Sequence, residues 1–80
     1  MKIEAFLTLN AVLRTGSFAA AAAEMNLTPS AVSMQMKQLE QYLGQPLFDR
    51  SGLQIRPRLS AFEVADAIRE GLERMEVLRR

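Results

Sequence analysis

Apolar residues recur every three or four positions in the first part of the chain, at Ile3, Phe6, Leu9, Val12 and Leu13. This spacing puts them on one face of an amphipathic helix, which Gly16 is expected to end. Ser17 then precedes Phe18 and a run of alanines, where its hydroxyl can accept a hydrogen bond from the free amides of a new helix. The pattern therefore predicts a first helix ending at Gly16 and a second helix over about residues 18–25.

A third helix is expected to begin at Pro29, because Thr28 supplies a capping hydroxyl and proline suits the first helical position. Gly44 is expected to end it in the left-handed conformation. Its buried stripe consists of apolar residues at helical spacing, Val32, Met36, Leu39 and Leu43. Its opposite face carries small, polar or flexible side chains, namely Ser30, Ser33, Met34 and Lys37. A face with so little bulk is suited to lie against another macromolecule.

Two short segments after this helix, Leu47–Arg50 and Gln54–Arg56, are separated by a serine and a glycine and are predicted to form a small two-stranded wing. Pro57 is expected to prevent the second strand from continuing. Ser60 and Glu63 have the spacing of a capping box, which predicts a fourth helix from about residue 60 to the end.

The apolar positions of this fourth helix alternate between three and four residues apart: Phe62, Ala65, Ile68, Leu72 and Met75, with Leu78 as a further candidate. This spacing is typical of the seam of a helix that packs lengthwise against a partner helix. Most acidic residues of the segment lie off this seam. The pattern predicts a homodimer in which the fourth helix packs against that of a second copy.

The composition supports one small folded domain, with 49% hydrophobic and 24% charged residues among 80. A chain of this length buries only about 60% of the surface that its unfolded form exposes, which also favours pairing with a second copy. Because the chain contains no His and no Cys, it offers no Ser/His or Cys/His nucleophile pair and no ordinary zinc site. We therefore expect no cofactor and no metal. We also expect no catalysis, although the composition alone leaves carboxylate or Ser/Lys chemistry open.

No membrane segment is expected. The longest charge-free stretch, residues 25–36, is about half the length needed to span a bilayer, and it contains Asn26, Thr28, Pro29 and two serines. The N-terminal sequence lacks the apolar core of a signal peptide. These features favour a cytoplasmic protein with no membrane partner.

Charge is distributed unevenly, although the net charge is only +1. Residues 1–58 hold six basic and four acidic residues, whereas residues 59–80 hold four basic and five acidic ones. A nucleic-acid-binding domain is usually more basic than this, so any basic face must be local. The residues available to build it are Lys37, Arg50, Arg56 and Arg58.

Two short helices joined by a tight turn, with a low-bulk outer face on the second, are typical of a helix-turn-helix. Only a helix without bulky outer side chains can enter the major groove and contact base edges. The same pattern also fits a helical hairpin that binds no nucleic acid. Several polar residues have a structural explanation in either case: Ser17 and Thr28 as caps, and Glu40 as an ion-pair partner of Arg50 or Lys37. Arg50 is equally suited to brace the wing or to bind a phosphate.

Many residues, at fixed spacings along the chain, agree with the sequence pattern of one known family. The motifs are Gly16-Ser17-Phe18, Ala21-Ala22, Leu27-Thr28, Ala31-Val32-Ser33, Leu39-Glu40, Leu43-Gly44 and Leu47-Phe48-Asp49-Arg50. Together they closely resemble, without gaps from about residue 3 to 56, the N-terminal winged helix-turn-helix of the LysR-type transcriptional regulators. The resemblance implies a mainly α fold. A winged helix-turn-helix of three helices and a two-stranded wing would occupy residues 1–58, followed by a long dimerising linker helix over residues 59–80.

The resemblance also implies sequence-specific binding of double-stranded DNA in transcription regulation. The recognition helix, about residues 29–43, would lie in the major groove, and the wing, residues 51–56, would reach the minor groove. The residues placed at base edges are Pro29, Ser30, Ser33 and Met34. The residues placed at the DNA backbone are Thr28, Lys37 and Arg50. Arg56 and Arg58 are added to them because they lie beside the wing in the sequence.

Two base-reading positions depart from the family pattern, since members often carry Gln where Pro29 stands and Arg where Met34 stands. Specificity is then expected to come from Ser30, Ser33, apolar contacts with thymine methyl groups and DNA shape. The usual Leu-Thr-Pro-x-Gly opening of the linker helix is replaced by Pro-Arg-Leu-Ser-Ala at residues 57–61. The start and angle of that helix are therefore left open.

In this family a larger domain follows the linker helix, binds a small-molecule effector and completes the oligomer, which extends to a tetramer. We therefore expect this chain to be a fragment of a longer regulator, with no effector site of its own. Two other functions compete with DNA binding. One is a small helical module for protein interaction and dimerisation, which the modest net charge favours. The other is a carboxylate-dependent hydrolase, which is disfavoured because no acidic pair lies outside the fourth helix.

Overall fold

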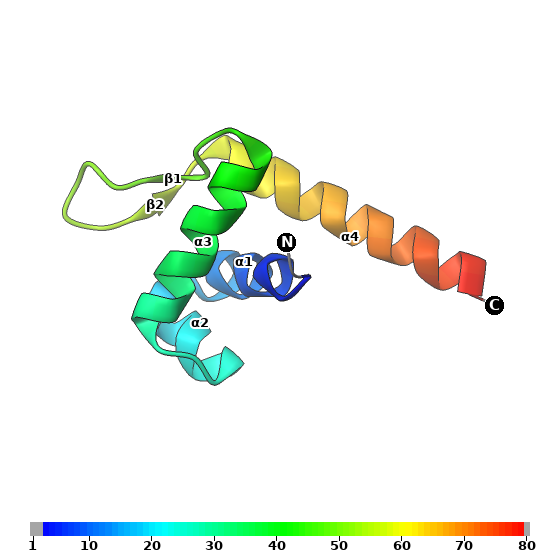
Figure 1. The fold of residues 1–80 in the computed structure, drawn as a ribbon, viewed down its shortest axis with the longest axis horizontal. Coiled ribbons are helices and arrows are strands. Elements are labelled where there is room, and N and C mark those ends of the chain that lie inside the picture. The colour runs from blue at the N-terminus through cyan, green and yellow to red at the C-terminus, as the bar shows by residue number, and fades with distance from the viewer. Residues whose placement is uncertain (1–2, 80) are drawn as a thin grey trace.

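The computed structural model describes residues 3–79. Its helices are α1 (Glu4–Thr15), α2 (Phe18–Met25), α3 (Pro29–Leu43) and α4 (Leu59–Arg79), and its strands are β1 (Phe48–Asp49) and β2 (Arg56–Pro57). The first three helices pack together, the antiparallel β1–β2 hairpin projects from one side of them, and α4 extends from the other (Figure 1). The hairpin with its loop, residues 48–57, is called the wing below. The predicted fold, a mainly helical winged helix-turn-helix with a long fourth helix, is confirmed.

The four predicted caps lie at ends of the first three helices, at the start of α2 and α3 and at the end of α1 and α3. The Ser17 hydroxyl accepts a hydrogen bond from the amide of Ala20, and the Thr28 hydroxyl accepts one from the amide of Ala31, each at 3.1 Å. α1 and α3 end at glycines with positive φ, 76° at Gly16 and 73° at Gly44. This backbone conformation costs glycine little because it has no Cβ.

The core lies where the first three helices meet the segment before the wing. Its largest fully buried apolar side chains come from α1, α3 and that segment: Leu9, Val32, Met36, Leu39 and Leu47. Ala21 and Ala22 are the buried residues of α2, and their small side chains let this helix approach its neighbours closely. The predicted buried stripe of α3 is confirmed, with Leu43 partly buried at its end.

The first half of α4 belongs to the same core. Ala61 is fully buried, and Val64, Ala65 and Ile68 pack against the core. Two members of the predicted dimer seam, Ala65 and Ile68, therefore contact their own domain. The three other members are exposed, and they are Phe62, Leu72 and Met75. In the part of the chain that the structure describes, no helix is long and apolar enough to cross a membrane.

The two strands are shorter than predicted. β1 lies within its predicted segment, whereas β2 is shifted toward the C-terminus. Leu47 is outside β1 because its amide donates to the carboxylate of Glu40. Its carbonyl still accepts a hydrogen bond across the hairpin from the amide of Arg58. Pro57, expected to block the second strand, instead lies within it and pairs with Phe48. A two-residue strand at the edge of a sheet tolerates proline, because no further strand requires its missing N–H.

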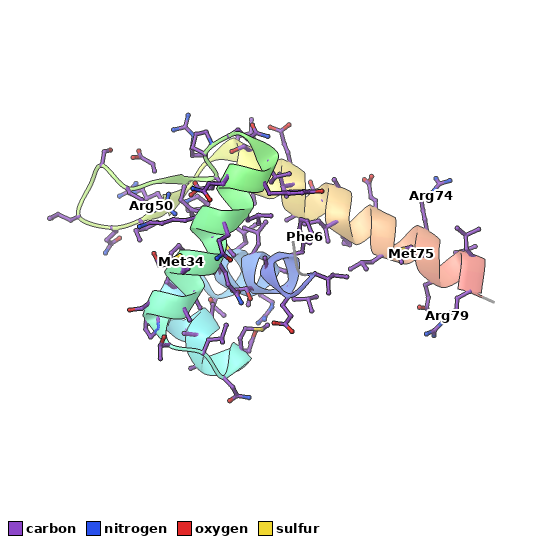
Figure 2. The ribbon with its side chains drawn as sticks, in the orientation of Figure 1. Phe6, Met34, Arg50, Arg74, Met75 and Arg79 are labelled. Atoms are coloured by element: carbon purple, nitrogen blue, oxygen red, sulfur yellow. The ribbon has the colours of Figure 1, made fainter. Side chains whose placement is uncertain are left out.

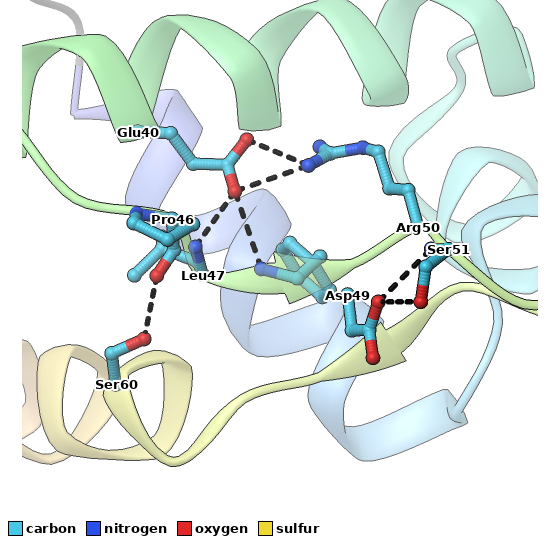
Figure 3. Close-up of polar contacts among 8 residues, drawn as sticks. Glu40, Pro46, Leu47, Asp49, Arg50, Ser51 and Ser60 are labelled. Carbon is cyan, nitrogen blue, oxygen red and sulfur yellow. Dashed lines mark hydrogen bonds and ion pairs between the residues drawn. The ribbon is translucent and has the colours of Figure 1, made fainter.

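The predicted capping box at the start of α4 is wrong. The helix begins at Leu59, and the amide of Ala61 donates to the carbonyl of Arg58 at 3.0 Å. Ser60 therefore lies in the first turn, where its hydroxyl donates to the carbonyl of Pro46 at 2.7 Å (Figure 3). This bond ties the base of α4 to the segment that precedes the wing.

Candidate nucleic-acid interface

The outer face of α3 combines exposure with small side chains. Thr28, Pro29 and Ser30 are exposed at its N-terminal end, and Ser33 is half-buried. Met34, with 56% of its surface accessible, is the large apolar residue of this face. Lys37 follows one turn later and is exposed. The structure thus places the predicted recognition residues of α3 along one side of the helix.

The wing lies beside this face. Met34 on α3 and Arg50 in the wing both lie on the side of the molecule from which the wing projects, whereas Arg74, Met75 and Arg79 lie far along α4 (Figure 2). The candidate nucleic-acid surface and the exposed end of α4 are therefore well separated. One surface can bind a ligand while the other pairs with a partner helix.

One partly buried carboxylate fastens the wing to α3. Glu40 accepts hydrogen bonds from the amides of Leu47 and Phe48 at 2.7 and 3.2 Å (Figure 3). The guanidinium of Arg50 donates to the same carboxylate, with its Nη1 2.9 Å from Oε1 and 3.1 Å from Oε2. These four residues are called the Glu40 network below. The predicted pairing of Glu40 is confirmed, with Arg50 as the partner.

The protonation of Glu40 reflects two opposed influences. Burial raises the pKa of its carboxyl, but the hydrogen bonds from Arg50, Leu47 and Phe48 and the charge of Arg50 outweigh burial and leave the pKa below its ordinary value. The carboxylate is therefore ionised at neutral pH. In that state Oε2 accepts hydrogen bonds from the two amides and from Arg50, and Oε1 contributes to the ion pair with Arg50.

Arg50 braces the wing in a second way. Its guanidinium carbon lies 5.8 Å from the centre of the Phe48 ring, within the range of a cation–π contact. The Phe48 ring in turn meets Phe18 of α2 edge to face, with centroids 5.2 Å apart. The bracing role foreseen for Arg50 is confirmed. Its contact with a phosphate stays a prediction.

Arg56 and Arg58 share their surroundings with an acidic residue. Asp49 stands opposite Arg56 in the hairpin register. The hydroxyl and amide of Ser51 donate to its carboxylate and lower the pKa of Asp49, and the charges of Arg58 and Arg56 lower it further. The base of the wing is thus less basic than two arginines alone would make it.

One exposed residue of the wing was not singled out from the sequence. Leu53 is fully exposed in the loop between β1 and β2. The available signal was an apolar residue directly after a serine and a glycine, in a segment predicted to be a turn. Periodicity did not reveal it, because a loop residue belongs to no helical or strand pattern.

Comparisons with known proteins agree with this geometry. The family described as bacterial regulatory helix-turn-helix proteins, lysR family, matches residues 3–61. The RuBisCO operon transcriptional regulator of Acidithiobacillus ferrooxidans is 44% identical over 66 residues, which are 82% of this chain and 21% of that protein. The probable HTH-type transcriptional regulator YhaJ of Escherichia coli is 50% identical over 52 residues, 65% of this chain and 17% of that protein.

Two solved structures are similar over nearly the whole chain. The crystal structure of ArgP from Mycobacterium tuberculosis has a TM-score of 0.71 at 37% identity and covers 94% of this chain and 28% of that one. A complex of the BenM DBD with benA site 1 DNA has a TM-score of 0.81 at 20% identity and covers 98% and 88%. At that identity the second likeness shows a shared fold.

The chain spans about a fifth of the length of the curated relatives it matches, 21% and 17%. The family match runs from α1 through the wing into the first turn of α4. The matched region contains the three packed helices, the capped third helix and the wing held by the Glu40 network. The chain belongs to the lysR family of bacterial regulatory helix-turn-helix proteins.

Proposed function

We propose that this chain is the sequence-specific DNA-binding part of a transcriptional regulator, with α3 in the major groove and the wing at the minor groove of duplex DNA. The observation that carries the proposal is the low-bulk outer face of α3 with a wing fastened beside it by the Glu40 network. The matched relatives are named transcriptional regulators, and a structure of this fold was solved with DNA. A cytoplasmic, non-enzymatic protein fits this role.

The proposed contacts divide by chemistry. The hydroxyls of Ser30 and Ser33 are suited to base edges, and Pro29 and Met34 are suited to thymine methyl groups. Thr28 lies at the helix N-terminus, where a backbone phosphate is favoured. The cationic contacts to the DNA backbone are Lys37, Arg50, Arg56 and Arg58. Since few long side chains read bases here, DNA shape is expected to contribute to specificity.

Fluorescence anisotropy with a random pool of short duplexes tests this function. Binding should weaken by orders of magnitude over a few-fold rise in salt, because each phosphate contact releases counterions. Selection of the bound fraction should enrich an interrupted inverted repeat, which is the mark of a two-fold symmetric reader. Absence of binding at low salt, or binding without salt dependence, would contradict the proposal and favour the protein-interaction module.

Lys37→Ala is expected to weaken binding to all DNA sequences about equally and to reduce the salt slope by about one unit per subunit. The reason is the loss of one phosphate contact from an exposed side chain of α3. Anisotropy titrations at several salt concentrations measure the slope. Arg74→Ala is the matched control, because it removes the same charge from α4, far from the wing (Figure 2). An equal slope change in both variants would remove Lys37 from the interface.

We also propose that the chain acts as a homodimer through α4, with residues 1–58 as the DNA-binding unit and residues 59–80 as the linker. The support is the exposure of Phe62, Leu72 and Met75 at seam spacing on a helix that leaves the core. Ala65 and Ile68 remain part of the proposed seam at the edge where α4 meets its own domain. An effector-binding domain and a tetramer are proposed only for a full-length regulator of this family; the match to one such regulator covers 21% of its length.

Met75→Asp is expected to convert the dimer to a monomer at micromolar concentrations, because an unpaired carboxylate buried in an apolar seam is costly. Met75 is exposed within the single chain (63%), so the fold itself should persist. Analytical ultracentrifugation measures the mass, and circular dichroism checks the helix content. Val77→Asp, at another exposed apolar position of α4, should remain dimeric. A dimeric Met75→Asp variant would place the seam elsewhere.

A further inference from the structure

The wing carries an apolar side chain that the fold does not use. Leu53 is fully exposed, and its neighbour Gln54 is also exposed. Burial of a leucine side chain is favourable, but this side chain contributes no burial to the stability of the domain. The loop is anchored at its start by the bond between Asp49 and Ser51, and the exposed leucine lies beyond this anchor.

The surroundings of Leu53 indicate what covers it. The wing projects past the core on the side of the α3 outer face (Figure 1). Arg50 and Arg56 flank the loop in the sequence, and Lys37 is exposed on the adjacent helix. Lys37 and these arginines, although Glu40 and Asp49 partly offset the charge of the arginines, attract the phosphate backbones that border a groove. In such a complex, an exposed apolar side chain in the wing loop would be available to contact the base edges on the groove floor.

We propose that Leu53, supported by the amide of Gln54, reads the minor groove by an apolar contact that favours A·T over G·C pairs. This inference rests on the proposed DNA-binding function. In the minor groove an A·T pair presents only acceptors, whereas a G·C pair adds the guanine 2-amino donor. A leucine pressed against that amino group leaves a buried donor unpaired, which weakens binding to G·C pairs. The Gln54 amide can donate to minor-groove acceptors, which both kinds of pair present, so the discrimination comes from Leu53.

The experiment uses duplexes enriched by selection with the unmodified chain and varied only at the pairs nearest the wing. Three versions carry A·T, G·C or inosine·C at those pairs. Inosine·C keeps the major-groove face of G·C but lacks the 2-amino group, so it isolates minor-groove readout. Anisotropy should show similar affinity for A·T and inosine·C and about tenfold weaker binding to G·C.

Leu53→Ser should reduce this discrimination to less than about twofold and leave the salt slope unchanged, because no charge is lost. Its thermal unfolding should match that of the unmodified chain, since the replaced side chain is fully exposed. Val77→Ser, which removes an exposed apolar side chain from α4, should retain the full discrimination. Leu53→Arg should strengthen binding to all three duplexes and steepen the salt slope.

Each contrary result has its own meaning. Equal binding of inosine·C and G·C by the unmodified chain, or discrimination retained by Leu53→Ser, overturns the role of Leu53 and leaves DNA binding intact. A uniform loss of affinity in Leu53→Ser shows a contact without readout and also overturns it. Failure of the unmodified chain to bind any duplex overturns the proposed function, and the role of Leu53 with it.

Discussion

Met34→Glu is expected to lower the affinity for duplex DNA by about 100-fold or more, because like charges brought together across an interface cost several kcal/mol. Met34 is exposed on the outer face of α3, between Ser30 and Lys37. In the proposed complex this face lies in the major groove, so the new carboxylate would meet phosphates and base acceptors. The domain should fold normally, because 56% of the methionine surface is already accessible.

Two controls define the Met34 result. Met34→Leu keeps an apolar side chain of similar size and should change affinity only a few-fold. Val77→Glu makes the same change from apolar to acidic at an exposed position of α4, and it should bind DNA nearly as well as the unmodified chain. Anisotropy at one fixed salt concentration compares the variants. Affinity of Met34→Glu within a few-fold of the unmodified chain would place the outer face of α3 outside the DNA interface.

Glu40→Ala is expected to destabilise the domain by about 2–4 kcal/mol, since an unpaired buried donor costs about 1–3 kcal/mol. The amides of Leu47 and Phe48 lose their acceptor, and Arg50 loses its ion-pair partner. Urea denaturation at constant protein concentration measures the free energy of unfolding. The melting temperature should fall by roughly 4–8 °C for each kcal/mol lost. Loss of less than about 0.5 kcal/mol would show that the network is not needed for stability.

Arg50→Met separates the parts of the Glu40 network. It keeps an apolar contact with Phe48 but removes the guanidinium, so both backbone bonds to Glu40 survive. A smaller loss is expected, about 1 kcal/mol, than for Glu40→Ala. If the two variants were equally unstable, the ion pair would outweigh the two amide bonds, contrary to this account.

The stability difference between the unmodified chain and Glu40→Ala should depend on pH. The pKa of Glu40 is lower in the folded chain than its ordinary value, so the folded state stabilises the ionised form. This contribution is complete above the pKa of glutamate in the unfolded chain, about 4.3, and is lost as the pH falls through the lower folded pKa. Urea unfolding at several pH values should show the difference shrinking in that range. A constant difference would exclude the charge of Glu40 as its source.

Local signals predicted most of the helical structure. Ser17, Thr28, Gly16 and Gly44 act within a few residues of their own positions, so the bounds of the helices were accessible from the sequence. The errors arose where a backbone group takes a distant partner. The amide of Leu47 bonds to a carboxylate seven residues earlier, and this bond keeps Leu47 out of the strand. The Ser60 hydroxyl likewise bonds to Pro46 instead of capping its own helix.

The site was predicted less completely than the fold. Helical periodicity alone placed Ser30, Met34 and Lys37 on one face of α3. Periodicity also gave the seam of α4, but an apolar stripe does not specify its partner. In the structure Ala65 and Ile68 of that stripe face their own core. Leu53 escaped notice because its importance depends on exposure, which only the three-dimensional arrangement reveals.

The base of α4 is attached to the segment before the wing, so a rotation of this helix moves the whole domain. Ala61 is buried in the core and Ser60 is bonded to Pro46, so the base of α4 moves with the domain. The helix has 21 residues, which at 1.5 Å per residue is about 30 Å. A rotation of roughly 10° about its far end displaces the base by about 5 Å, more than the 3.4 Å step between base pairs. In the proposed dimer, a small change in the crossing angle of the two α4 helices would therefore change the separation of the DNA half-sites that the dimer can bind.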